Sequence, residues 1–271
     1  MLEKGARSSK SQTKPILVPD DDHLAAGSQA LPENSNQHGD DKMASKRSKL
    51  TAKDEPFAGP RSSSLSKVFK SYHGLDDVHI PIFQAVQRVV ESGKVLYPGS
   101  FCHVQASLVF PDVTYVDCDP KLELCFNDEV VREWIHRNRG YRGPARVEFL
   151  CKNFDHELGL PEQAFDLLIS ASAGVVTRPC AKYIKVGGYI VVSDSHFDAR
   201  TAYLDSRLTL RMVYDKETKS FSSNIDGCFE TVESGPMTQA QVDLSFTKPK
   251  SKHPFKLKRD DALFFLFERV M

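Results

Sequence analysis

The chain has 271 residues, of which 36 are Lys or Arg and 36 are Asp or Glu, so its formal net charge is zero. A neutral chain is not attracted as a whole to nucleic acid or to an anionic membrane, which excludes binding driven by net charge. With 40% hydrophobic and 27% charged residues, the composition is that of an ordinary globular protein of one or two domains.

Residues 1–62 differ in composition from the rest of the chain. Stretches such as SSKSQTKP and GPRSSS are rich in polar and charged residues and hold almost no aromatic or β-branched ones. Such a segment buries too little apolar surface to offset the entropy of ordering it, so we expect a disordered polar tail. The basic run 42–49 (KMASKRSK) is either a nuclear-import or phosphate-contacting cluster or, as short runs of this kind usually are, a solvated part of that tail.

The six cysteines are scattered without a Cys-x-x-Cys pair, and several lie in apolar runs such as VEFLCKNF. We expect them to be small buried side chains with reduced thiols. The N-terminus lacks the apolar core of a signal peptide, and no apolar run approaches the ~18 residues of a membrane-spanning helix. These features predict an intracellular protein with no membrane partner, cytoplasmic unless the basic run directs it to the nucleus.

Order is expected to begin near Leu65. Apolar residues recur at helical spacing in SLSKVFKSYHG and HIPIFQAVQRVVESG, which predicts two helices, the second ended by Gly93. From Lys94 the chain alternates between two kinds of segment. Apolar or β-branched runs predict strands at 95–97, 113–119, 145–151, 165–170, 189–195, 208–214 and 262–270. Helical spacing predicts helices at 103–110, 122–138 and 178–188, the last ended by the Gly187–Gly188 pair.

Strands of continuous apolar character, separated by helices, predict a parallel sheet that is covered on both faces. The polar segment 215–259 carries weak signals and is expected to be partly loop. The fold class that follows is α/β: a doubly wound, mostly parallel sheet spanning residues 63–271.

Four segments in this order resemble the class I S-adenosylmethionine-dependent methyltransferases. KVLYPGSF corresponds to the family's first strand and glycine-rich loop, and VTYVDCDP to its second strand, which ends in an acid. VEFLCKNFDHELGLPEQAFDLLIS corresponds to the third strand, adenine loop and fourth strand. AKYIKVGGYIVVSDSH corresponds to the helix, Gly-Gly turn and fifth strand. The resemblance spans residues 94–196. It implies an antiparallel last strand at 262–270, S-adenosyl-L-methionine as cofactor, and a methyl acceptor. No Asn-Pro-Pro-Tyr-like motif follows the fourth strand, so a small-molecule or protein acceptor is favoured over a nucleic-acid base.

The resemblance also implies which residues bind the cofactor, since ligands of open α/β sheets bind beyond the carboxyl ends of the strands. Gly99 lets the ligand approach the backbone. Asp117, or Asp119 in its place, accepts hydrogen bonds from the ribose hydroxyls, and Asn153 or Asp155 contacts the adenine amino group. The remaining candidates flank the first turn or close the fourth strand: Tyr97, Ser100 and Ser170.

Two of these assignments have structural alternatives. Gly99 follows Pro98 and is equally explained as a turn glycine, and Asp117 is also placed to cap the helix that follows Pro120. The first loop departs from the family as well, because 100–103 (SFCH) has side chains where glycines are usual. Phe101 either fills the space of the cofactor or stacks beside it.

The function that the resemblance implies is an S-adenosylmethionine-dependent methyltransferase of unknown acceptor, and the alternative is a catalytically silent methyltransferase-like binding or scaffold domain. A nicotinamide-dependent oxidoreductase is disfavoured because PGSFCHV lacks the Gly-x-Gly-x-x-Gly motif. An open hollow between Gly99, Asp117 and Asn153 would favour the methyltransferase. Side chains of the protein packed into that hollow would favour the silent domain.

Methyl transfer from a sulfonium needs an in-line nucleophile, a dry pocket and, for some acceptors, a base. His103 follows the first strand, and Asp194 and His196 end the fifth, so we expect the three to face one cleft, where a histidine beside a carboxylate suits a base. The alternative for His196 is an exposed loop residue or helix cap. Asp194, His196 and Asp198 alternate in sequence, but without a further histidine in a recognisable pattern we predict no metal site.

Overall fold

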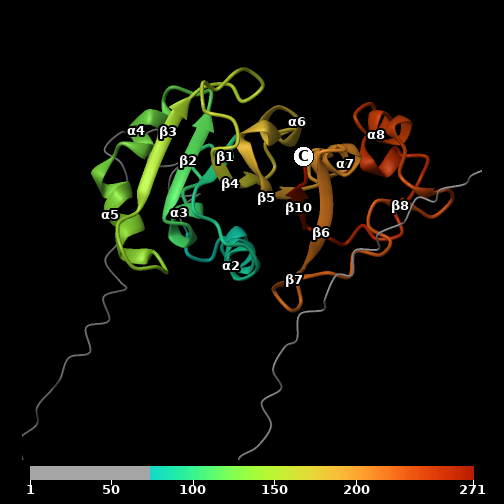
Figure 1. Cartoon of the computed structure of the whole chain (residues 1–271), viewed down its shortest axis with the longest axis horizontal. Coiled ribbons are helices and arrows are strands. Elements are labelled where there is room, and N and C mark those ends of the chain that lie inside the picture. Colours follow the sequence, from blue (N-terminus) through green and yellow to red (C-terminus); the bar gives the residue numbers. More distant parts are fainter. Residues whose placement is uncertain (1–73) are drawn as a thin grey trace, which may run out of the picture. The chain divides into compact units, whose positions relative to one another are not determined.

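The computed structural model describes residues 74–271 (Figure 1). The predicted polar tail, the basic run 42–49 and all but the last residue of the first expected helix lie outside the described residues. Within residues 74–271, no helix combines the length and the apolar character needed to cross a membrane.

An eight-stranded sheet forms the centre of the domain, with the strand order β3-β2-β1-β4-β5-β10-β6-β7 (Figure 1). The strands have these bounds: β1 Val95–Pro98, β2 Asp112–Asp117, β3 Arg146–Cys151, β4 Phe165–Ser170, β5 Ile184–Ser193, β6 Leu208–Asp215, β7 Ser220–Ser222 and β10 Phe264–Arg269. Strands β1 to β5 pair in parallel, and β10 runs antiparallel between β5 and β6. The predicted mostly parallel sheet with an antiparallel last strand is confirmed.

Helices cover both faces of this sheet, as predicted. One face carries α2 His79–Val89, α3 Ala106–Val109, α4 Leu122–Phe126 and α5 Glu129–Asn138, and the other carries α6 Thr177–Cys180, the 3₁₀ helix η1 Ala181–Tyr183, α7 Asp198–Leu204 and α8 Gln239–Ser245. Each face has its own hydrophobic cluster because successive strand side chains point to opposite sides. Val95 and Tyr97 belong to the first cluster, and Leu96 between them belongs to the second.

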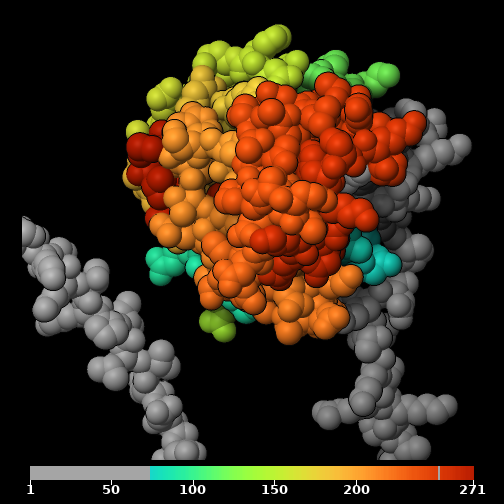
Figure 2. Space-filling view, turned by 90° about the vertical axis from the view of Figure 1, so that its right-hand side faces the viewer, coloured from blue at the N-terminus to red at the C-terminus, as the bar shows by residue number. Residues whose placement is uncertain are grey.

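The segment 215–259 holds more regular structure than the sequence predicted. It contains β7, the hairpin of β8 Glu230–Thr231 and β9 Gly235–Pro236, helix α8 and the short 3₁₀ helix η2 Lys250–Lys252. Helix α8 begins at a capping box in which Thr238 and Gln241 bond each other's backbone N–H groups. Figure 2 shows the C-terminal part of the domain, in orange and red, covering one of its faces.

Several predicted element boundaries are wrong. The helix predicted at 122–138 is two helices, because the Asp128 carboxylate accepts a hydrogen bond from the Val130 N–H and starts α5 there. Helix α2 ends at Val89, before Gly93. The Gly187–Gly188 pair does not end a helix but lies inside β5, where the pairing with β4 shifts register. A Cβ on Gly188 would lie 2.9 Å from the Asp166 carbonyl oxygen, so this glycine permits the bulge.

Candidate functional site

The turns after β1, β2 and β3 are joined by hydrogen bonds at the carboxyl edge of the sheet. The Gly99 N–H donates to the Val116 carbonyl oxygen (2.7 Å), and the Lys152 N–H donates to the Asp117 carbonyl oxygen (2.9 Å). Because β1 lies between β2 and β4, this is the point where the strand order reverses and where α/β sheets bind ligands. The structure thus places Gly99, Asp117 and Asn153 on adjacent turns.

The carboxylate of Asp117 already accepts hydrogen bonds from the backbone of its own chain. Its Oδ2 accepts from the Phe101 N–H (3.0 Å) and its Oδ1 from the Asp119 N–H (3.2 Å). Asp119 in turn accepts from the Lys121 N–H (2.9 Å), just before α4. Both acids therefore stabilise turns, and a ribose would have to share the Asp117 oxygens with two backbone donors.

The two adenine candidates lie on the exposed turn after β3. The Asn153 side-chain oxygen accepts a hydrogen bond from the Asp155 N–H (2.9 Å), which closes a local turn. Both side chains are exposed to solvent. Between them lies the half-buried Phe154, whose carbonyl oxygen accepts from the Cys180 thiol at 3.9 Å.

Side chains of the protein occupy the space next to Gly99. A Cβ built on Gly99 would lie 2.1 Å from the Cβ of Ala173 and 3.4 Å from the Phe154 ring, and one built on Gly174 would lie 3.9 Å from the same ring. The turn after β4 therefore packs directly on the turn after β1, with Phe154 against both. The ring of Phe101, by contrast, packs against the first hydrophobic cluster. In this arrangement Ala173 and the Phe154 ring, and not open space, lie directly next to Gly99.

Gly99→Ala is expected to lower the free energy of unfolding by about 2–3 kcal/mol, because the new methyl group meets Ala173 and the backbone is left-handed. The φ angle of Gly99 is +64°. Urea unfolding measures the loss. Gly143→Ala is the control: its φ is +93°, but nothing lies within 4 Å of its added Cβ, so about 1 kcal/mol is expected there. Equal losses in the two variants would contradict the close packing of the two turns.

The other cofactor candidates make hydrogen bonds elsewhere in the protein. The Tyr97 hydroxyl is 2.8 Å from His103 Nδ1, and the Ser170 hydroxyl donates to Asp198 Oδ2 (2.6 Å). Ser100 is buried, and its carbonyl oxygen accepts from the His103 N–H (3.0 Å). The structure therefore does not bring Tyr97 or Ser170 into one site with Asp117.

The three residues predicted to act in catalysis do not share a cleft. His103 packs on the side of the first cluster. Its ring contacts the ring of His79, which in turn contacts the ring of Phe264 of β10. Asp194 is on the opposite side, where it lines a cavity of about 420 Å³ with the next residue of β10, Phe265. The prediction of one cleft is wrong because consecutive residues of β10 face opposite sides of the sheet.

The residues at the end of β5 have separate roles. The Asp194 carboxylate forms a buried ion pair with Arg200 at 2.9 Å. Asp198 is buried and accepts hydrogen bonds from the turn between β4 and α6. His196 is exposed. This matches the alternative reading of His196 as a loop residue.

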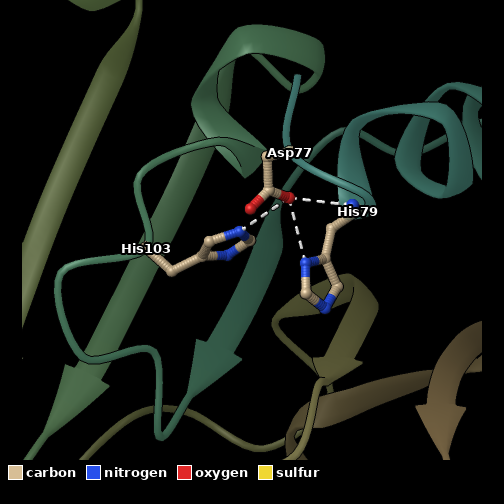
Figure 3. A group of neighbouring side chains, drawn as sticks. All are labelled: Asp77, His79 and His103. Carbon is tan, nitrogen blue, oxygen red and sulfur yellow. Dashed lines mark hydrogen bonds and ion pairs between the residues drawn. The ribbon is translucent and has the colours of Figure 1, made fainter. Parts of the chain in front are cut away.

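A cluster that the sequence did not predict lies before α2 (Figure 3). Oδ1 of Asp77 accepts from the His79 N–H (2.8 Å) and lies 3.0 Å from His79 Nδ1 and 3.2 Å from His103 Nε2. Tyr97 completes the network through the other nitrogen of His103. The sequence signal for this cluster was the Asp-x-His spacing directly before a helix. His103 is distant in the sequence, and the fold brings it next to Asp77.

Burial and hydrogen bonds together set the pKa values of this cluster. Burial raises the pKa of Asp77, but hydrogen bonds from His103 and His79 outweigh burial and hold that pKa well below its usual range. Burial lowers the pKa of His103, against the hydrogen bond to Asp77, which raises it. Burial also raises the pKa of Tyr97 well above its ordinary value. With the Asp77 carboxylate as the acceptor beside Nε2, the geometry favours the His103 tautomer whose Nε2–H donates to Asp77 while Nδ1 accepts from the tyrosine hydroxyl.

No family model and no curated protein matches the chain. Among solved structures, it is similar to the YcgJ protein of Bacillus subtilis, with 17% identity over 43% of this chain and 50% of that chain and a TM-score of 0.33. The chain thus spans half the length of YcgJ. It is also similar to a SAM-dependent methyltransferase of Methanosarcina mazei, with 12% identity over 69% of this chain and 97% of that chain and a TM-score of 0.35.

A third similar structure is a TehB-like SAM-dependent methyltransferase of Corynebacterium glutamicum, with 12% identity over 76% of this chain and 96% of that chain and a TM-score of 0.39. The fold itself is read from the strands of this chain. A mostly parallel sheet with β10 antiparallel between β5 and β6, and helices on both faces, makes residues 74–271 a class I methyltransferase-like α/β domain.

Proposed function

We propose that residues 74–271 form a methyltransferase-like binding or scaffold domain that does not transfer a methyl group from S-adenosyl-L-methionine. The observation that carries the proposal is the filled space at the carboxyl edge, where Ala173 meets Gly99 and Phe154 lies against both turns. Close-packed side chains and a bound nucleoside cannot occupy the same volume. The side chains of 100–103 in place of a glycine-rich loop agree with this proposal.

Methyl transfer is the second candidate function, and one observation favours it. The turns that carry Gly99 and Asp117 are joined at the point of strand reversal, where this class of sheet binds ligands. Each carboxylate oxygen of Asp117 can accept a further hydrogen bond. This candidate requires Phe154 and Ala173 to move aside, and its acceptor is a small molecule or a protein.

Calorimetric titration of the full chain with S-adenosylmethionine and S-adenosylhomocysteine separates the two candidates. We expect no heat of binding at millimolar ligand, because Phe154 and Ala173 exclude the nucleoside. Asp117→Ala tests the predicted ribose contact, and Asp112→Ala, at the other end of β2, is the matched control. Binding by the wild-type chain that is lost in Asp117→Ala and kept in Asp112→Ala would overturn the silent domain and establish the cofactor site.

A further inference from the structure

Asp77, His79 and His103 supply one carboxylate and two imidazoles whose ligand atoms all lie within 4.8 Å of one another (Figure 3). Oδ1 of Asp77 is 3.0 Å from His79 Nδ1 and 3.2 Å from His103 Nε2. Ligands on a tetrahedral zinc ion with bonds of about 2.0 Å are separated by about 3.3 Å. The two nitrogens therefore already lie at nearly the distance from the carboxylate oxygen that a shared ion requires.

Tyr97 supplies the partner that a metal-bound histidine needs on its other nitrogen. Its hydroxyl lies 2.8 Å from His103 Nδ1. When Nε2 of His103 coordinates a metal, its proton moves to Nδ1, and the tyrosine oxygen accepts that N–H. Hydrogen bonds of this kind orient the ring and raise the basicity of the ligating nitrogen. The Tyr97 hydroxyl can therefore donate to Nδ1 in the empty cluster and, after rotation about its C–O bond, accept from Nδ1–H when a metal ion is bound.

The cluster is fixed by packing and remains open to solvent. The ring of His79 contacts those of Phe83 and Phe264, and the ring of His103 contacts those of Phe83 and Tyr97. The side chain of His103 is 7% exposed, whereas those of Asp77 and His79 are 19% and 24% exposed. An ion can thus enter from the side of Asp77 and His79, and three protein ligands leave a fourth position for water.

We propose that Asp77, His79 and His103 bind one divalent first-row transition-metal ion, zinc in the first instance, with Tyr97 as the hydrogen-bond partner of His103. Two imidazoles with one carboxylate suit zinc and ferrous iron, whereas magnesium and calcium prefer oxygen ligands. The site lies beside the turn after β1 but does not use Ala173 or Phe154, which lie next to Gly99. The result of its test is therefore independent of the test of the proposed function.

Zinc titration of the chelator-treated full chain, followed by calorimetry, tests the site. We expect one ion per chain, and an affinity at least 100-fold weaker in His79→Ala and in His103→Ala. Tyr97→Phe should weaken binding about 10-fold, because it removes only the hydroxyl that bonds the other ring nitrogen of His103. Cobalt in place of zinc should give the intense visible bands of a four-coordinate ion, and magnesium should not displace it.

Two controls separate this site from other zinc-binding groups. His156→Ala removes an exposed histidine outside the cluster. The double change Cys118→Ser with Cys151→Ser removes the thiols just after β2 and at the end of β3. Both are expected to leave the affinity unchanged. Circular dichroism of the metal-free variants establishes that they are folded. Absence of stoichiometric zinc binding, or zinc binding that survives His79→Ala and His103→Ala, would show that the cluster is only a hydrogen-bonded start of α2.

Discussion

Arg200→Met is expected to lower the free energy of unfolding by about 3–5 kcal/mol, the usual loss when one member of a buried ion pair is removed. The Arg200 guanidinium donates to Asp194 Oδ2 (2.9 Å) and to the Ser245 hydroxyl (2.8 Å), and it lies over the Phe197 ring. It thereby joins α7 to the end of β5 and to α8. The variant leaves the buried Asp194 carboxylate without its guanidinium. Urea unfolding measures the loss, provided that the dependence of the unfolding free energy on urea concentration is the same in both proteins.

Arg211→Met is the matched control for this prediction. Arg211 also bonds an acid, with its Nε 2.7 Å from Glu268, but its side chain is exposed. Exposed pairs contribute about 0–1 kcal/mol because water replaces the lost interaction. A further change of Asp194 to leucine in the Arg200→Met background should restore part of the stability, since it removes the buried carboxylate that has lost its guanidinium. Equal losses in Arg200→Met and Arg211→Met would show that the Arg200 pair does not hold α7 and α8 in place.

Asp198→Ala is expected to lower the free energy of unfolding by about 3–4 kcal/mol, because several buried donors lose their acceptor at once. Oδ2 of Asp198 accepts from the Ser170 hydroxyl (2.6 Å), the Val176 N–H (3.1 Å), and both the N–H (3.1 Å) and the hydroxyl (2.9 Å) of Thr177. These donors belong to the turn between β4 and α6, so the loss should also speed amide hydrogen exchange in that turn. Denaturant unfolding and hydrogen exchange measure the two effects.

Asp215→Ala provides the comparison for Asp198→Ala. Asp215 likewise accepts from backbone donors, the N–H groups of Glu217 (2.8 Å) and Thr218 (3.1 Å), but in an exposed turn. Water can bond those donors after the change, so we expect a loss below about 1 kcal/mol. If Asp198→Ala were no more costly than Asp215→Ala, the turn after β4 would not depend on the buried carboxylate.

The fold was predictable because its strongest signals lie in short stretches of sequence. The apolar runs of β4 and of the second half of β5 could only be strands buried on both sides, and the structure has them at the centre of the sheet. The errors arose where two signals competed. The Gly187–Gly188 pair is typical of a helix end, but the register shift against β4 also requires glycine. The capping box of Thr238 and Gln241 was readable in the sequence and was missed.

The candidate site was predictable only in part, because its decisive contacts join residues from different elements. Gly99 and Asp117 could be placed on neighbouring turns, since parallel strands end at one edge of the sheet. That Phe154 and Ala173 fill the adjoining space depends on side-chain packing between turns. His103 was recognised as chemically capable, but its partner Asp77 is 26 residues away in the chain and was not.

The position of β10 has a consequence for synthesis of the protein. Within residues 74–271, β5 and β6 do not pair with each other, and β10 (Phe264–Arg269) lies between them and pairs with both. Until those residues have been synthesised and have paired, β5 and β6 each present an edge of unsatisfied backbone N–H and C=O groups to other chains. Chaperones that shield exposed strand edges should matter most in that interval.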